Sequence, residues 1–248
     1  MKGVILAGGT GSRLFPLTKV TNKHLLPVYD KPMIYYPLEC MAKAGIEQVL
    51  LVTGGNNPGD FVRLLGNGRE FGFKTLNYTY QDGAGGIAQA LGLAEGFADG
   101  DSICLILGDN ILEYTIADSV RRFRHQGEGA KILLSQVENP TAYGVAEMDG
   151  DRVVRIVEKP KEPKSNWAVI GIYFYDGKVF DTVKTLKPSA RNELEITDVN
   201  NAYIERGFMT ADKVRGWWAD AGENIDFYLK ACNQVAASGA NKEPPPGL

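Results

Sequence analysis

The chain has 248 residues, of which 44% are hydrophobic and 23% charged, and its formal net charge is −3. This composition is typical of a globular protein that folds as one large domain or two small ones. The acidic balance argues against a nucleic-acid partner, and no apolar run approaches the ~20 residues that a membrane span needs. Three widely spaced cysteines and two histidines indicate neither a disulfide framework nor a histidine-based metal site.

Strand and helix patterns alternate along the first half of the chain. The first residues already have a strand pattern, so we expect no signal peptide, no membrane partner and a cytoplasmic location. Apolar runs predict strands at 4–6, 47–55 and 102–110, and alternation predicts a strand at 76–81. Helical spacing predicts helices at 31–45, 59–68 and 86–98. This order predicts a mostly parallel sheet with helices on both faces, in which ligands bind at the carboxyl ends of the strands.

The second half of the sequence is richer in strand patterns. We expect strands at 130–137 and 167–176, a hairpin with a "DGD" turn at 144–160, and closing helices at 193–207 and 223–237. We expect a single domain over residues 1–240, with halves of about 1–125 and 126–240, and a flexible tail at 241–248.

A glycine-rich loop follows the first strand, in the stretch "GVILAGGTGSRLFPLT". Gly9 and Gly11 match the first two glycines of a dinucleotide-binding motif, but Leu14 replaces the third. Asp30 has the spacing of the acid in that motif, yet it lies in a turn rather than at the end of a strand. A Walker loop is also excluded, because no Gly-Lys-Ser/Thr follows. A dinucleotide-dependent oxidoreductase is therefore disfavoured.

The same loop is well suited to binding phosphate. Glycine amides can approach phosphate closely because no β-carbon intervenes. Arg13 can then donate two parallel hydrogen bonds to phosphate oxygens, and Lys23 can add a second positive charge. A tight turn with solvated basic residues is the structural alternative.

The stretch "LAGGTGSRLFPLT", followed by "NKHLLPVYDKPMI", resembles the signature of the sugar-phosphate nucleotidylyltransferases. Within that family the chain is most similar to members that transfer a thymidylyl group. The resemblance implies a three-layer α/β/α Rossmann-like nucleotidyltransferase fold with a mixed, mostly parallel central sheet. It implies transfer from dTTP to glucose 1-phosphate, giving dTDP-glucose for cell-surface polysaccharide synthesis and releasing pyrophosphate. The first half would bind the nucleotide and the second half the sugar phosphate.

The reaction that the resemblance implies brings two anions together. It needs a divalent cation and basic side chains rather than a protein nucleophile. Asp109 ends the apolar run "CLILGD", and Asp220 lies in "GWWADAG". The resemblance makes both aspartates ligands of Mg²⁺, although by their residues alone each could instead cap a helix. The residues that it implies in catalysis are Arg13, Lys23 and Asp109.

The resemblance also implies residues that bind the two substrates. Gln81 presents an amide donor and acceptor, which match the hydrogen-bonding edge of thymine or uracil. Lys159 and Arg191 would hold the sugar phosphate, and Pro160 is expected to keep Lys159 extended. Glu158 would accept hydrogen bonds from sugar hydroxyls. The complete expected sets are Leu6, Gly8, Gly9, Gly11, Arg13, Gln81 and Gly86 for the nucleotide, and Tyr143, Gly144, Glu158, Lys159, Val169 and Arg191 for the sugar phosphate.

Two kinds of alternative remain: another substrate for an enzyme of this family, and a protein of another class. Thymine differs from uracil by one methyl group, worth only ~1 kcal/mol of apolar contact, so UTP or another sugar 1-phosphate stays open. A non-catalytic sensor of nucleotide sugars is the alternative from another class, but such a protein is expected to lose a catalytic residue. The resemblance implies a homo-oligomer of the short form, without the extra C-terminal helical segment of longer members.

Overall fold

The computed structural model describes residues 1–55 and 57–245. The chain forms two compact units, and both are discontinuous in sequence. Unit 1 comprises Met1–Ala84, Ile106–Asp118 and Arg215–Leu248, and unit 2 comprises Gly85–Leu105 and Ser119–Val214. These units do not coincide with halves at 1–125 and 126–240, because residues 85–105 belong to unit 2 and residues 215–240 belong to unit 1.

Unit 1 is built on parallel strands. β1 (Lys2–Ala7) and β5 (Thr75–Gln81) pair with opposite edges of β4 (Gln48–Gly54), and all three run in the same direction. β1 and β4 are continuous apolar runs with almost every residue buried, as expected for strands that are covered on both faces. The carboxyl ends of the three strands therefore lie at one edge of the sheet.

The helices of unit 1 are α1 (Tyr35–Lys43), α2 (Pro58–Leu65) and α8 (Ile225–Ser238). Asn224 begins α8, where its Oδ1 accepts a hydrogen bond from the amide of Phe227. Two short antiparallel ribbons complete the unit: β2 (Pro27–Val28) with β3 (Lys31–Pro32), and β7 (Asn110–Leu112) with β13 (Trp218–Asp220).

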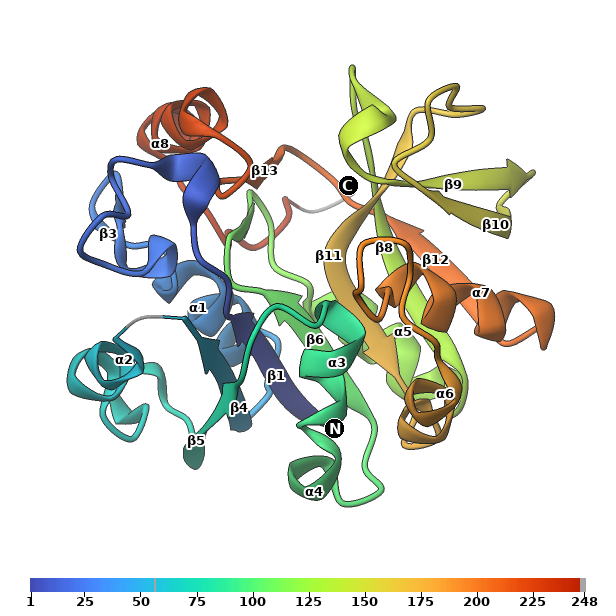
Figure 1. Cartoon of the computed structure of the whole chain (residues 1–248), viewed down its shortest axis with the longest axis horizontal. Coiled ribbons are helices and arrows are strands. Elements are labelled where there is room, and N and C mark those ends of the chain that lie inside the picture. Colours follow the sequence, from blue (N-terminus) through green and yellow to red (C-terminus); the bar gives the residue numbers. More distant parts are fainter. Residues whose placement is uncertain (56, 246–248) are drawn as a thin grey trace. The chain divides into compact units, whose positions relative to one another are not determined.

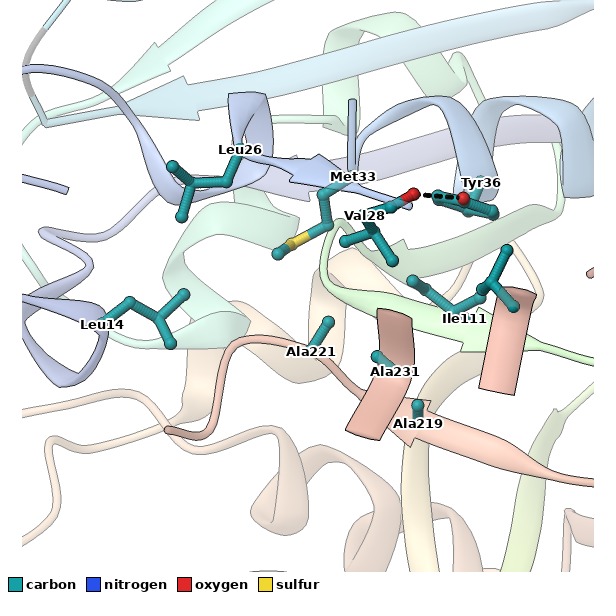
Figure 2. Close-up of a cluster of buried hydrophobic side chains, with 10 residues drawn as sticks. Leu14, Leu26, Val28, Met33, Tyr36, Ile111, Ala219, Ala221 and Ala231 are labelled. Atoms are coloured by element: carbon teal, nitrogen blue, oxygen red, sulfur yellow. Dashed lines mark hydrogen bonds between the residues drawn. The ribbon is translucent and has the colours of Figure 1, made fainter. Parts of the chain in front are cut away.

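An apolar cluster fixes these segments of unit 1 to one another. Leu14, Val28, Tyr36, Ile111 and Ala231 are all at most 1% exposed and pack together, although they come from five separate parts of the chain (Figure 2). The hydroxyl of Tyr36 donates to the carbonyl oxygen of Val28 at 2.6 Å, so its polar end is satisfied inside the cluster. The cluster holds the loop after β1 and the segment before α8 in place.

Unit 2 contains mainly antiparallel strands. β11 (Trp167–Tyr175) pairs antiparallel with β8 (Ala130–Gln136) and with β9 (Gly144–Asp149), and β9 forms a hairpin with β10 (Arg152–Glu158). β12 (Met209–Lys213) pairs parallel with β8. Its helices are α3 (Ile87–Gly92), α4 (Glu95–Ala98), α6 (Val179–Thr185) and α7 (Ile196–Glu205). β6 (Ile103–Leu107) and α5 (Ala117–Gln126) cross between the units.

These elements confirm the predicted α/β class with a mixed sheet. The hairpin at 144–160 forms as expected, with Gly150 at φ 61° in its turn. The helix expected at 86–98 is two short helices, because α3 ends at Gly92 and α4 begins at Glu95. In the part of the chain that the structure describes, no helix is long and apolar enough to cross a membrane.

The start of the segment expected to be a flexible tail is anchored to unit 1. Asn241 is 1% exposed, and its Nδ2 donates to the carbonyl oxygen of Tyr36 at 2.8 Å. The ammonium group of Lys242 lies 2.8 Å from Oε1 of Glu113. The structure thus differs from the expectation at these two residues, because buried polar contacts fix them. Residues 246–248 lie outside the described residues.

Candidate active site

The glycine loop begins where β1 ends and turns sharply. Gly9 and Gly11 have φ of 92° and 64°, a backbone region that favours glycine. Thr18 Oγ1 donates to the carbonyl oxygen of Gly11 at 2.8 Å, and the fully buried Leu14 anchors the following turn. A β-carbon on Gly11 would lie 3.3 Å from the β-carbon of Lys23, so the loop and this lysine are in contact.

Gln81 lies against the same loop. It is the last residue of β5, and its register partner in β4 is Gly54. A β-carbon added to Gly8 would lie 3.1 Å from Gln81 Oε1, so any larger residue would displace this amide. The structure therefore brings together the predicted nucleotide-binding residues of unit 1, namely Leu6, Gly8, Gly9, Gly11, Arg13 and Gln81.

The two predicted metal-binding aspartates are positioned by the β7–β13 ribbon. Its register pairs Asp220 with Asn110, the residue directly after Asp109. The amide of Ala221 donates to the carbonyl oxygen of Asp109 at 2.9 Å, and the amide of Gly108 donates to the carbonyl oxygen of Leu6 at 2.8 Å. The ribbon and the end of β1 thus bring residues 109 and 220 together, 111 positions apart in sequence.

Lys23 contacts the first of these two carboxylates. Its Nζ is 2.5 Å from Oδ2 of Asp109, and both side chains are largely buried. Burial alone would lower the pKa of Lys23, but Asp109 and, more weakly, Asp220 raise it above its usual value. Burial would likewise raise the pKa of Asp109, but Lys23 holds it well below its usual range. Both groups are therefore charged at neutral pH.

Asp220 has the opposite electrostatic environment. Its burial and the neighbouring Asp109 carboxylate raise the pKa of Asp220 well above its usual range. One lysine thus faces two carboxylates, of which Asp109 is buried and Asp220 half-buried.

Asn110 and Trp218 orient Asp109, and the sequence analysis assigned neither of them. Asn110 Nδ2 donates to Asp109 Oδ1 at 3.1 Å, and the indole Nε1 of Trp218 donates to Asn110 Oδ1 at 2.7 Å. Because an indole N–H can only donate, it fixes the Asn110 amide so that Nδ2 faces Asp109. The only sequence signal was the position of both residues beside the predicted aspartates.

Gly222 and Glu223 are further site residues that sequence reasoning missed. A β-carbon on Gly222 would lie 2.3 Å from Asp109 Oδ2 and 2.6 Å from Lys23 Nζ. Glu223 accepts a hydrogen bond from Arg13, with 2.5 Å between Nη1 and Oε2. We call Asp109, Asp220 and Glu223 the carboxylate cluster. Arg13 is joined to this cluster by Glu223, which is 210 positions away in sequence.

The carboxylate pair fits a divalent cation. Within residues 1–55 and 57–245, no group of three or more His, Cys, Asp or Glu residues is arranged to hold a metal ion. Mg²⁺ commonly binds through one or two carboxylates together with substrate phosphates, and nucleotidyl transfer generally uses such an ion. Asp109 and Asp220 supply that number of carboxylates, and a single lysine faces the two.

A second group of predicted residues converges in unit 2. Glu158 ends β10, and its register partner is Gly144, which also pairs with Val169 of β11. A β-carbon on Gly144 would lie 3.4 Å from Glu158 Oε2. The hydroxyl of Thr197 donates to that oxygen at 2.7 Å and fixes the carboxylate, a contact that the sequence did not indicate.

Tyr143 and Lys159 flank this group. The amide of Lys159 donates to the carbonyl oxygen of Tyr143 at 3.0 Å. Lys159 has φ 43°, so the extended backbone expected from Pro160 is wrong. The hydrogen bond prolongs the β9–β10 hairpin by one residue, and the chain then turns away at Lys159. A positive φ at a non-glycine residue costs about 1–3 kcal/mol and is common at functional sites.

Arg191 is held by acidic side chains. Its Nε and Nη2 lie 3.2 Å and 2.8 Å from the two carboxylate oxygens of Glu195. Glu158 and Glu193 lie 3.7 Å and 3.6 Å from the same guanidinium. The predicted sugar-phosphate residues Tyr143, Gly144, Glu158, Lys159, Val169 and Arg191 thus all belong to unit 2.

Gly86 lies in unit 2, whereas the other predicted nucleotide-binding residues lie in unit 1. Its φ is 93°, and a β-carbon there would lie 2.4 Å from the carbonyl oxygen of Leu194. The amide of Leu194 donates to Gly85 at 2.8 Å, and that of Ala88 donates to Leu194 at 3.1 Å. The packing of the 191–195 segment is therefore sufficient to require glycine at position 86.

The glycine loop, Lys23 and the two aspartates lie together in unit 1, and comparison with known proteins shows the class of protein. The family model for nucleotidyl transferases matches residues 2–238. The chain belongs to the nucleotidyl transferase family and is an enzyme of that class.

Its relatives carry a more specific name. The chain is 46% identical over 235 residues to a glucose-1-phosphate thymidylyltransferase of Neisseria meningitidis, covering 93% of this chain and 81% of the relative. It is 47% identical over 239 residues to one of Mycolicibacterium smegmatis, covering 95% and 82%. A Bacillus anthracis crystal structure, assigned to the same activity and in complex with sucrose, is 52% identical with a TM-score of 0.91 over 95% of each chain.

Proposed function

We propose that the chain transfers a thymidylyl group from dTTP to glucose 1-phosphate, forming dTDP-glucose and releasing pyrophosphate. The observation that carries this proposal is the contact of Lys23 with both Asp109 and the glycine loop, in a chain whose relatives are named for this activity. Unit 1 would bind the triphosphate through this cluster, and unit 2 would bind the sugar phosphate.

The proposed step is a displacement at the α-phosphorus. An oxygen of the sugar phosphate forms a bond to this phosphorus, the bond to the bridging α–β oxygen breaks, and its electron pair leaves with pyrophosphate. No protein nucleophile is needed. Mg²⁺, held by Asp109 and Asp220, would neutralise phosphate charge during the transfer.

The chain's own residues would bind and orient the substrates. Arg13 and Lys23 would stabilise the negative charge that develops on pyrophosphate. Gln81 would donate to and accept from the thymine base, and glycine at position 86 would let the backbone approach the base. Lys159 and Arg191 would hold the attacking phosphate, and Glu158 would accept hydrogen bonds from sugar hydroxyls.

A pyrophosphate-release assay tests the proposal. It would combine dTTP, UTP, CTP, ATP and GTP with several sugar 1-phosphates, with Mg²⁺ and with a chelator. We expect release with dTTP and glucose 1-phosphate, and its loss with chelator. Preference for UTP or another sugar phosphate would correct the substrate, whereas silence across the panel would favour a non-catalytic sensor.

We further propose a cytoplasmic homo-oligomer, as the sequence resemblance implies. dTTP and sugar phosphates are cytoplasmic metabolites, which supports this location. Light scattering on the purified protein would measure the assembly, and a mass equal to one chain would refute the oligomer.

A further inference from the structure

Arg13 and Glu223 form an ion pair at the rim of the carboxylate cluster in unit 1. Arg13 Nη1 lies 2.5 Å from Glu223 Oε2, a charge-assisted hydrogen bond. Lys23, the other predicted phosphate-binding cation of this cluster, is engaged by Asp109. Glu223 therefore binds Arg13, the side chain that the proposed reaction needs for binding phosphate.

Both partners stand on fixed backbone. Arg13 follows Gly11 in a short turn that the buried Leu14 anchors. Glu223 lies between Ala221, which is 0% exposed, and Asn224, whose side chain caps α8. The two side chains can therefore separate and rejoin without rearranging the fold.

The exposure of the pair makes it exchangeable. The side chain of Arg13 is 56% exposed and that of Glu223 is 21% exposed. Because the Arg13 side chain is more than half exposed, solvent screens the pair, so a phosphate ligand with several negative charges can displace the single carboxylate. By contrast, the Lys23–Asp109 pair is largely buried and would be costly to break.

We propose that Glu223 is an exchangeable counter-ion of Arg13, which competes with the phosphates of the substrate and recaptures the guanidinium when pyrophosphate leaves. This inference rests on the proposed function, because it requires Arg13 to bind phosphate. Glu223 is a positioning residue that acts through Arg13. Its competition weakens the binding of pyrophosphate and so favours product release.

The test measures the binding of inorganic pyrophosphate, in the presence of Mg²⁺, by isothermal titration calorimetry. The proteins are wild type, Glu223→Gln, Arg13→Ala and the double variant. Asp226→Asn is the matched control, since it removes one carboxylate from the exposed first turn of α8. Thermal unfolding of each variant checks that the fold is intact.

We expect Glu223→Gln to bind pyrophosphate about threefold to tenfold more tightly than wild type, because Arg13 no longer has to leave a carboxylate. Arg13→Ala should bind more weakly. In the Arg13→Ala background the Glu223→Gln change should have little effect, and Asp226→Asn should leave affinity near that of wild type.

Other outcomes distinguish the phosphate-binding role of Arg13 from the counter-ion role of Glu223. If Arg13→Ala weakens binding but Glu223→Gln does not strengthen it, the inference fails and the phosphate role of Arg13 stands. An equal gain with and without Arg13 would show a general charge effect and also overturns the inference. If Arg13→Ala binds as tightly as wild type, both the phosphate role of Arg13 and the inference fail.

Discussion

The Nζ atom of Lys23 lies 2.5 Å from Oδ2 of Asp109, with only 18% and 12% of their side chains exposed. The pair links the glycine loop to the end of β6, since Lys23 also packs against Gly11. Breaking a buried pair leaves an uncompensated charge, whereas replacing an exposed one changes little. Lys23 and Asp109 should therefore affect both stability and activity.

We expect Asp109→Asn to lower turnover by about 10²–10³, the typical effect of losing one electrostatic contact in a transition state. The substitution keeps the side-chain shape but removes the charge that faces Lys23. Asp60→Asn is the control, because Asp60 forms an exposed ion pair with Arg63 on α2. Steady-state pyrophosphate release measures both variants. Near-normal turnover in Asp109→Asn would contradict the assignment.

Gly222→Ala should impair the site through sterics alone. The added β-carbon would lie 2.3 Å from Asp109 Oδ2 and 2.6 Å from Lys23 Nζ, so the ion pair must shift. We expect turnover to fall at least tenfold, with the far-ultraviolet circular dichroism unchanged. Gly96→Ala is the matched control, since among the described residues, its chain neighbours and the backbone of its own helix apart, no atom lies within 4 Å of its β-carbon. Equal activity of the two variants would show that the site tolerates the shift.

We expect the buried His24 to lower the free energy of unfolding in mild acid. Burial and the neighbouring Lys23 lower the pKa of His24 to about 3, while in the unfolded chain it stays near its ordinary value of 6.5. The unfolded state therefore binds a proton first, and the free energy of unfolding falls as pH falls below about 6.5. From pH 7.5 to pH 5 this group alone accounts for about 2 kcal/mol.

Urea unfolding of wild type and His24→Gln at both pH values isolates this contribution. Asp220 acts in the opposite direction, because its raised pKa favours the folded state as pH falls. The comparison between the two proteins cancels that effect. We expect His24→Gln to lose less stability than wild type over this interval, and parallel losses would mean that His24 is not the titrating group.

The sequence predicted those features that depend on local patterns. Continuous apolar runs predicted β1 and β4, and the "DGD" turn predicted the β9–β10 hairpin. α5 was not predicted, because only Val120 and Phe123 form a narrow apolar stripe among charged residues. The helix at 86–98 was predicted too long for a related reason, since apolar spacing alone does not reveal where Gly92 ends α3.

Local sequence patterns did not predict the tertiary contacts between distant segments. Family resemblance predicted Asp109 and Asp220, yet the register that pairs Asp220 with Asn110 is a property of the folded ribbon. Glu223 was missed because its partner Arg13 is 210 residues away. The positive φ of Lys159 was also missed, since the local effect of Pro160 was overridden by the hydrogen bond to Tyr143.

Glu195 should position Arg191 for the sugar phosphate. The carboxylate binds Nε and Nη2 of Arg191, and Ser189 Oγ donates to its Oε1 at 2.6 Å. The side chain of Glu195 is only 13% exposed, so it is a fixed support rather than an exchangeable partner. Glu195→Gln replaces one acceptor oxygen by a donor and so breaks the two-point contact.

We expect Glu195→Gln to raise the KM for glucose 1-phosphate about threefold to thirtyfold while changing the KM for dTTP less, because a mobile guanidinium holds the sugar phosphate poorly. Glu205→Gln is the control, since Glu205 is exposed at the far end of the same helix. Initial rates with each substrate varied in turn measure the two constants. An equal rise in both constants would indicate a general loss of structure, and no rise would show that Arg191 does not need this support.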